Sequence, residues 1–140
     1  MNDISTYRYL AKPLKKLAKV PQVRLGGVAC FIIKNNSIVS SGMNHNPTGG
    51  PMEYEVDGKL MTRPEVIHAE VAAINAAAEN NVDISGSVLF MTMSPCINCA
   101  KAITKTPIEE VIYMYDWWDK AALQILHDAG IKTKKLKEDS

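Results

Sequence analysis

The sequence predicts a three-layer α/β/α fold with a central mixed sheet of about five strands. Predicted helices and strands follow one another over the 140 residues in the order α-β-β-α-β-α-β-α-β, an alternation typical of layered α/β domains. A short turn joins the two early strands, so they are expected to pair as an antiparallel hairpin. A helix separates each pair of later strands, and such connections place strands parallel.

The first 25 residues are expected to form an N-terminal helical segment. Ser5 or Thr6 can cap a helix, and Pro13 is expected to bend this helix or to begin a second one. The apolar residues of the segment are Tyr9, Leu10, Leu14, Leu17 and Ala18.

A hairpin and a long loop are expected next. Gly27 to Ile33 is an apolar run, Lys34-Asn35-Asn36 supplies a turn, and Ser37 to Met43 continues as the second strand. Residues 44–63 contain several prolines and glycines and an acidic patch, and they are interpreted as one long loop insertion. Loops of this length are usually functional or mobile.

The second half of the chain alternates helices with strands. Pro64 suits the first turn of a helix that a run of alanines continues to Asn80. Gly130 is well placed to follow the end of the last helix. The remaining elements are expected at residues 88–93 (strand), 95–106 (helix), 109–115 (strand), 119–129 (helix) and 131–136 (edge strand).

Length and composition favour a single globular domain, residues 1–140. The chain has 46% hydrophobic and 22% charged residues, which is ordinary for a protein with a buried core. No apolar run approaches the roughly 20 residues of a membrane helix, and the N-terminal stretch lacks a signal-peptide pattern. We therefore expect a cytoplasmic protein with no membrane partner, in the host cytoplasm if the chain is viral.

The charge balance does not favour a nucleic-acid partner. The formal net charge is +1, so the molecule as a whole has no strong attraction for a polyanion. Basic residues gather in residues 1–24 and 132–137, where a solvated helix face and a chain end explain them. Trp117 and Trp118 fit a core or a subunit interface as well as they fit base stacking.

Two short motifs place reactive side chains at predicted helix starts. They are His68-Ala69-Glu70 and Pro95-Cys96-Ile97-Asn98-Cys99. Two cysteines in a Cys-x-x-Cys can reach one metal ion, and the helix dipole stabilises their thiolates. A histidine makes a third zinc ligand and leaves the fourth position open, as in catalytic sites. Glu70 is two positions from His68 and so is not a ligand on the same helix face, but it can reach the open position as a proton carrier.

These motifs also have simpler interpretations. A cytosolic Cys-x-x-Cys can be a redox pair, although Ser94 and Pro95 stand where such pairs usually have an aromatic residue. A structural zinc site would need a fourth ligand, from a carboxylate, His45, His127 or Cys30. Cys30 lies in an apolar strand and is expected to be a small core residue. An odd number of cysteines without a secretion signal still favours metal binding or catalysis over disulfides.

From Gly26 to about Leu136 the chain resembles the zinc-dependent cytidine and deoxycytidylate deaminase superfamily, and within it the deoxycytidylate (dCMP) deaminases. The zinc motifs match the signature His-x-Glu followed by Pro-Cys-x-x-Cys. The segments that carry the resemblance are Gly27-Val28-Ala29, Ser41 to Pro47, His68 to Ile74, Ser94 to Ile103 and Glu110 to Tyr113.

The resemblance implies hydrolytic deamination of dCMP to dUMP and ammonia, which supplies the precursor of dTMP. It implies Zn²⁺ as the catalytic cofactor, with Glu70 moving protons between water, N3 of the cytosine ring and the leaving amine. Asn44 is expected to contact the sugar. Backbone groups of Ala69 and Ser94 are expected to hold the base, and Arg24 is a candidate for the 5′-phosphate.

The resemblance also implies a homo-oligomer and regulation by nucleotides. Members are typically activated by dCTP and inhibited by dTTP, bound with Mg²⁺ near a Gly-Tyr-Asn-Gly-x-Pro segment. This chain keeps Gly42, Asn44 and Pro47 of that pattern but has Met43 for the tyrosine and His45 for the second glycine. Asn44 and His45 are therefore the candidate effector-binding residues, and His45 could instead add a metal ligand.

Three other functions remain open, two enzymatic and one non-catalytic. A tRNA adenosine deaminase has nearly the same zinc motifs, but typically a shorter connection from the asparagine to the histidine and Asp-Pro-Thr-Ala before His-Ala-Glu. Here Arg63 to Ile67 precede His68. A deaminase of free cytidine usually has Cys at the position of His68. A non-catalytic zinc-binding module is the third possibility, and it has no use for the carboxylate of Glu70.

Overall fold

The computed structural model describes residues 4–18, 28–116 and 120–136 of the chain. Asp119, the expected start of the last helix, and Trp117 and Trp118 lie outside these residues, as does Gly27, the expected start of the first strand. The described elements are α1 (Ile4–Ala18), β1 (Ala29–Lys34), β2 (Ser37–Met43), β3 (Glu53–Val56), β4 (Lys59–Thr62), α2 (Ala69–Glu79), β5 (Val88–Met93), α3 (Ile97–Ile103), β6 (Glu110–Tyr115), α4 (Ala121–Asp128) and β7 (Lys132–Lys135).

Five strands form a mixed sheet in the order β2-β1-β5-β6-β7. β1 is antiparallel to both β2 and β5, whereas β5, β6 and β7 are parallel to one another. Asn35 and Asn36 both have positive φ in the β1–β2 turn, the conformation that a tight hairpin turn requires. The predicted hairpin, the parallel strands and the edge position of β7 are confirmed.

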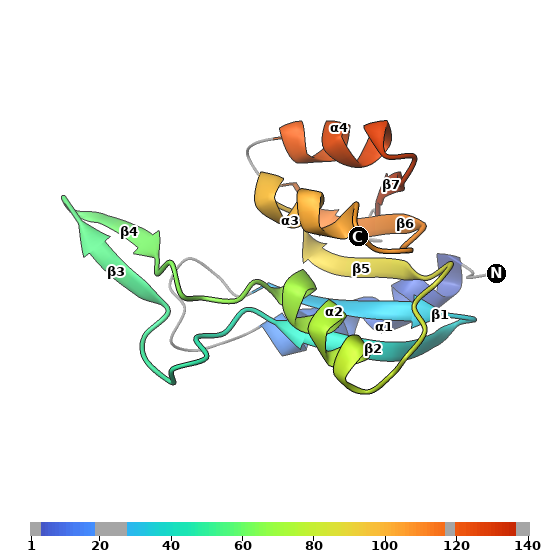
Figure 1. Cartoon of the computed structure of the whole chain (residues 1–140), viewed down its shortest axis with the longest axis horizontal. Helices are drawn as coiled ribbons and strands as arrows, with labels where there is room; N and C mark the ends of the chain where they lie inside the picture. Colours follow the sequence, from blue (N-terminus) through green and yellow to red (C-terminus); the bar gives the residue numbers. More distant parts are fainter. Residues whose placement is uncertain (1–3, 19–27, 117–119, 137–140) are drawn as a thin grey trace.

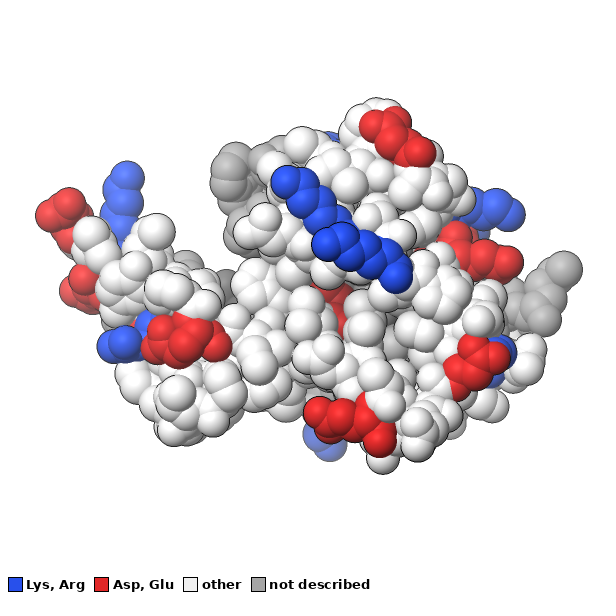
Figure 2. Space-filling view, viewed as in Figure 1, with Lys and Arg blue, Asp and Glu red and all other residues white. Residues whose placement is uncertain are grey.

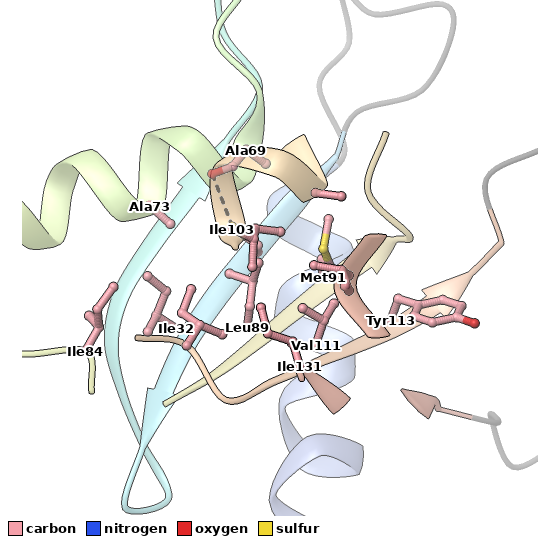
Figure 3. Packing of buried hydrophobic residues seen from close by; sticks show 14 of the residues in the cluster. Ile32, Ala69, Ala73, Ile84, Leu89, Met91, Ile103, Val111, Tyr113 and Ile131 are labelled. Atoms are coloured by element: carbon pink, nitrogen blue, oxygen red, sulfur yellow. Dashed lines mark hydrogen bonds between the residues drawn. The ribbon is translucent and has the colours of Figure 1, made fainter. Parts of the chain in front are cut away.

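Helices cover both faces of this sheet (Figure 1). α1 lies on one face, where Tyr7 and Leu14 pack in a cluster with Phe31 and Phe90, and the rings of Tyr7 and Phe90 meet edge to face with centroids 5.5 Å apart. Residues of α2, α3 and α4 pack on the other face in a second cluster, part of which Figure 3 shows. The three-layer arrangement is confirmed.

The two clusters explain why the central strands are apolar at consecutive positions. Along β1, Phe31 and Ile33 point to the α1 side, and Cys30 and Ile32 point to the side of the other helices. Successive side chains of a strand face opposite ways, so a strand covered on both faces needs apolar residues throughout.

Two helix starts differ from their predictions. α1 begins at Ile4, so Ser5 and Thr6 lie inside it and are not its N-caps, and Pro13 lies within one helix instead of beginning a second. α2 begins only at Ala69 instead of near Pro64. The reason is a bridge in which the backbones of His45 and Ile67 exchange hydrogen bonds of 3.0 and 2.8 Å, which holds the chain extended up to His68.

Residues 44–63 do not form one long loop, and this prediction was wrong. They contain the two-stranded sheet of β3 and β4, which projects from the body of the molecule (Figure 1). Asp57 and Gly58 have φ of 52° and 80°, as a two-residue hairpin turn requires. A hydrogen bond of 2.9 Å from the Arg63 N–H to the Met52 carbonyl closes the base of this hairpin.

Charged side chains of both signs are interspersed on the face shown in Figure 2, including those on the projecting hairpin. This distribution agrees with the near-zero net charge of the chain. Among the described residues, no helix has both the length and the apolar character that crossing a membrane requires.

Candidate metal centre and active site

The structure brings His68, Cys96 and Cys99 together at the beginnings of α2 and α3. His68 is the N-cap of α2, Cys96 is the N-cap of α3, and Cys99 lies in the first turn of α3. Nδ1 of His68 is 3.7 Å from Sγ of Cys96 and 3.2 Å from Sγ of Cys99. One ligand atom from each residue lies within 4.8 Å of the others. The three predicted ligands therefore point toward one place.

This group fits a zinc ion. Usual zinc bond lengths and tetrahedral angles separate a nitrogen ligand from a sulfur ligand by about 3.6 Å, close to both distances above. One imidazole and two thiolates are donors that zinc prefers. Three protein ligands leave one tetrahedral position for water or substrate, which distinguishes a catalytic site from a structural one.

Within the part of the chain that the structure describes, no fourth residue joins the group. His45 lies elsewhere, with Nδ1 at 3.1 Å from the Met43 carbonyl. Nε2 of His127 is 2.6 Å from the Thr133 hydroxyl. Cys30 is fully buried, and its thiol donates to a backbone carbonyl. The structure therefore does not support the alternative of a closed structural site built with one of these residues.

The thiols of Cys96 and Cys99 shift the pKa of each other in opposite directions. A hydrogen bond from the Cys99 thiol lowers the pKa of Cys96 to about 4, with a smaller contribution from the imidazole of His68. The same hydrogen bond, together with burial, raises the pKa of Cys99. Cys96 is therefore a thiolate at neutral pH. Metal binding favours deprotonated ligands, so a cation at this place would displace the proton of Cys99.

Glu70 is buried in the first turn of α2, with only 3% of its surface exposed. Burial raises the pKa of its carboxyl group, which is also close enough to Cys99 to form a hydrogen bond with it. A carboxyl whose pKa is raised toward neutrality can both accept and donate a proton. Its position beside the metal group suits the proton carrier that the sequence predicts.

A pocket of about 190 Å³ opens next to this group. Predicted site residues from separate parts of the chain line it, which brings the substrate candidates Asn44, Ala69 and Ser94 into one cavity with Glu70. Arg24 lies outside the described residues. The residues that line the pocket are Val28, Asn44, Thr62, Val66, His68, Ala69, Glu70, Met91, Met93, Ser94 and Cys96.

Asn44 is held in a fixed orientation at the pocket. Its side-chain Oδ1 accepts a hydrogen bond of 2.9 Å from the Val28 N–H, and the backbone N–H of Asn44 donates to the Val28 carbonyl at 3.1 Å. With Oδ1 engaged in this way, the side-chain amino group is the donor that Asn44 can offer to a ligand. His45, the other candidate effector residue, does not line the pocket.

Several pocket residues were missed by the sequence analysis. Val28, Val66, Met91 and Met93 form apolar walls, and an apolar side chain beside a pocket has the same sequence pattern as one in the core. Thr62 reaches the pocket from the end of β4. The Asp57-Gly58 dipeptide, which favours a two-residue hairpin turn, is the signal that could have placed Thr62 on a strand.

Comparisons with known proteins agree with this geometry. The family model described as the cytidine and deoxycytidylate deaminase zinc-binding region matches residues 1–115. Deoxycytidylate deaminase of Homo sapiens is 33% identical over 130 residues, covering 85% of this chain and 71% of the relative. The enzyme of Enterobacteria phage T4 is 30% identical over 151 residues, covering 75% and 76%.

A solved structure is also similar over nearly the whole chain. The crystal structure of dCMP deaminase from the cyanophage S-TIM5, in complex with dCMP and dUMP, superimposes with a TM-score of 0.78 at 29% identity and covers 94% of each chain. This protein therefore belongs to the cytidine and deoxycytidylate deaminase family, and the part of it that matches the family model is the zinc-binding region.

Proposed function

We propose that this protein deaminates dCMP hydrolytically, giving dUMP and ammonia. The observation that carries the proposal is the pocket in which the three-ligand group, the buried carboxylate of Glu70 and the fixed amide of Asn44 meet. The relatives named deoxycytidylate deaminase and the cyanophage structure with dCMP and dUMP support this choice of substrate.

His68, Cys96 and Cys99 would hold the zinc ion. When bound there, zinc lowers the pKa of a coordinated water toward neutrality and so supplies a nucleophile for C4 of the cytosine ring. Glu70 takes up a proton of the attacking water at its carboxylate and gives it to N3 of the ring. It then takes up the second proton from the oxygen newly bonded to C4 and delivers it to the exocyclic amine, which leaves as ammonia. The buried position of Glu70 limits its contact with bulk water.

The remaining pocket residues orient the nucleotide. The amino group of Asn44 is assigned to the sugar, and the N–H of Ala69, in the first turn of α2, is assigned to the base because such N–H groups have no partner within the helix. The N–H of Ser94 donates to the Tyr115 carbonyl at 2.9 Å. The Ser94 carbonyl is therefore its backbone group that can accept from the exocyclic amine.

A panel of substrates tests the proposal. Zinc-loaded protein is assayed with dCMP, dCTP, deoxycytidine, cytidine and an adenosine-containing tRNA stem-loop, following loss of the amino group. We expect dCMP to have the highest kcat/KM, because a phosphate site left without its charge partner discriminates strongly against the nucleoside. Activity on the stem-loop alone would indicate a tRNA adenosine deaminase instead. Equal kcat/KM for dCMP and deoxycytidine would show that the protein has no site that recognises the 5′-phosphate.

Regulation by dCTP and dTTP, bound with Mg²⁺ near Asn44 and His45, is part of the same proposal. The exposed ring of His45 lies beside Asn44 on a segment tied to Ile67, directly before the histidine ligand. A nucleotide bound at His45 would thus be connected to His68 by the backbone bridge to Ile67, and it could change the position of His68 through that bridge. Coupling of typical size shifts the apparent dCMP affinity roughly 5- to 150-fold. Superimposable dCMP saturation curves with Mg²⁺ alone, with dCTP and with dTTP would show that the enzyme is unregulated.

The proposal also covers the oligomeric state of the protein, its cellular location and the residue that contacts the 5′-phosphate of dCMP. We expect a homo-oligomer acting in the cytoplasm, which sedimentation of the purified protein and fractionation of its cells would check. Arg24 remains the candidate for the 5′-phosphate, and Arg24→Ala is expected to raise KM for dCMP while leaving the kcat/KM for deoxycytidine unchanged.

A further inference from the structure

The first turn of α2 rests on two cross-strand partners of the sheet, Cys30 on β1 and Gly42 on β2. The thiol of Cys30 donates a hydrogen bond of 3.2 Å to the Ala69 carbonyl. A Cβ atom on Gly42 would lie 2.4 Å from the same carbonyl oxygen and 2.6 Å from the N–H nitrogen of Ala73. Because neither distance leaves room for a methyl group, the helix can approach the sheet this closely only over a glycine.

These contacts lie directly behind the active site. Ala69 stands between His68 and Glu70 in the sequence, and Figure 3 shows Ala69 and Ala73 on the side of α2 that faces the buried cluster. The hydroxyl of Ser40, two residues before Gly42 on β2, donates to the Ala73 carbonyl at 2.7 Å. The N-cap His68 makes no capping hydrogen bond with its side chain, so contacts with the sheet anchor this helix end.

We propose that Cys30 is a positioning residue for the deamination, and that its hydrogen bond to the Ala69 carbonyl over the bare backbone of Gly42 sets where His68 and Glu70 lie relative to Cys96 and Cys99. The catalytic part of this inference rests on the proposed function. The metal-binding part rests only on the His68, Cys96 and Cys99 group. Cys30 itself neither lines the pocket nor joins that group.

A thiol suits this position for physical reasons. Cys30 is fully buried, and burial raises the pKa of its thiol, so it keeps the proton that it donates. Alanine would remove the donor, whereas serine would keep one. A small displacement of the helix start is expected to lower the reaction rate strongly, since a misplacement of about 1 Å far from the reacting group can cost on the order of 100-fold in rate.

The test compares Cys30→Ala, Cys30→Ser and the control Ile32→Val, which trims a fully buried side chain on the same strand and face. Zinc affinity is measured by competition with a chromogenic chelator, and kcat and KM are measured with dCMP. Loss of a hydrogen bond made directly to a metal ligand typically costs 10- to 100-fold in affinity, and the bond from Cys30 reaches Ala69, the residue next to His68. For Cys30→Ala we therefore expect a loss at the lower end of this range, about 10-fold, in zinc affinity and about 10-fold in kcat, with KM within about twofold.

Cys30→Ser is expected to regain most of both losses, and Ile32→Val is expected to lower Tm without changing either quantity. Wild-type zinc affinity and kcat in Cys30→Ala would overturn the inference, as would a Cys30→Ser variant no better than Cys30→Ala, or a control that loses as much. If the wild type does not deaminate dCMP but Cys30→Ala still loses zinc affinity and Cys30→Ser regains it, the proposed function fails and the positioning of His68 stands.

Gly42→Ala provides a second variant that leaves the thiol in place. Its new methyl group must push the start of α2 away from β2, so we expect a loss of zinc affinity at least as large as that of Cys30→Ala. Wild-type zinc affinity in a folded Gly42→Ala protein, judged by circular dichroism, would contradict the inference independently.

Discussion

The three-layer body and the β3–β4 hairpin are stabilised in different ways. In the body, β1 and β5 are buried at every position except the last, because helices cover both faces of the sheet. In the hairpin, every described residue is half-buried or exposed, and Val56 and Met61 leave 43% and 46% of their surfaces accessible. Packing therefore holds the body together, whereas a tight turn and cross-strand hydrogen bonds hold the hairpin.

The site follows the same division. His68, Cys96, Cys99 and Glu70 all lie at helix starts that rest on the packed sheet, where a donor atom can be held in place. The hairpin reaches the pocket only through Thr62 among its strand residues. The candidate catalytic residues thus lie on the packed part of the molecule, and the hairpin borders the pocket. The predictions below test this division, from the largest expected effect to the smallest.

Cys99→Ala is expected to have the largest effect. Loss of one of three ligands should abolish stoichiometric zinc binding and dCMP deamination, and it should lower Tm because metal binding contributes to folding stability. Zinc content by elemental analysis and Tm by calorimetry check this. The control Lys101→Ala changes an exposed residue of the same helix and should keep its zinc. Full zinc occupancy in Cys99→Ala would show that the metal binds elsewhere.

Glu70→Gln should separate chemistry from metal binding. An amide cannot carry protons, so we expect kcat to fall by about 10²- to 10⁴-fold while zinc content stays at the wild-type level. Glu79→Gln, at the exposed far end of the same helix, is the matched control and should be fully active. Turnover near the wild-type rate in Glu70→Gln would assign the proton transfers to another group.

A pair of methionines compares packing in the two regions. Met91 on β5 is fully buried, whereas Met61 on β4 is 46% exposed. Met91→Ala should lower the free energy of unfolding by about 2–5 kcal/mol through the cavity it leaves, and Met61→Ala should change it by less than about 0.5 kcal/mol. Urea denaturation measures both. Equal losses would mean that the hairpin is as tightly packed as the body.

Shortening the hairpin is expected to affect the fold less than the Met91→Ala substitution does. Glu53 and Thr62 are cross-strand partners, so a Gly-Gly linker can replace residues 54–61. We expect zinc binding to be retained and Tm to stay within about 4 °C, the shift that about 1 kcal/mol produces in a domain of this size, because the body does not depend on packing against β3 and β4. KM for dCMP should rise as Thr62 loses its support. Unfolding of the shortened chain would show instead that the hairpin is part of the core.

Much of this organisation can be predicted from local pattern. The β1–β2 hairpin, the parallel strands and the helices between them follow from apolar runs and turn residues, because a strand covered on both faces has a recognisable composition. The candidate ligand pair Cys96 and Cys99 also follows from short-range spacing, whereas the choice of His68 follows from the resemblance to the deaminase signature. Zinc coordination demands particular donor types at particular separations, so these residues are visible before any fold is known.

Other features depend on contacts between residues far apart in the sequence, and only the tertiary structure decides them. The delayed start of α2 results from pairing of Ile67 with His45, a long-range contact that overrides the local preference of Pro64 for a first helical turn. The hydrogen bond from Cys30 to Ala69 and the position of Thr62 at the pocket likewise bring together segments that share no sequence motif. Spacing shows which side chains can bind zinc, whereas packing of the sheet against α2 decides where Glu70 stands beside them.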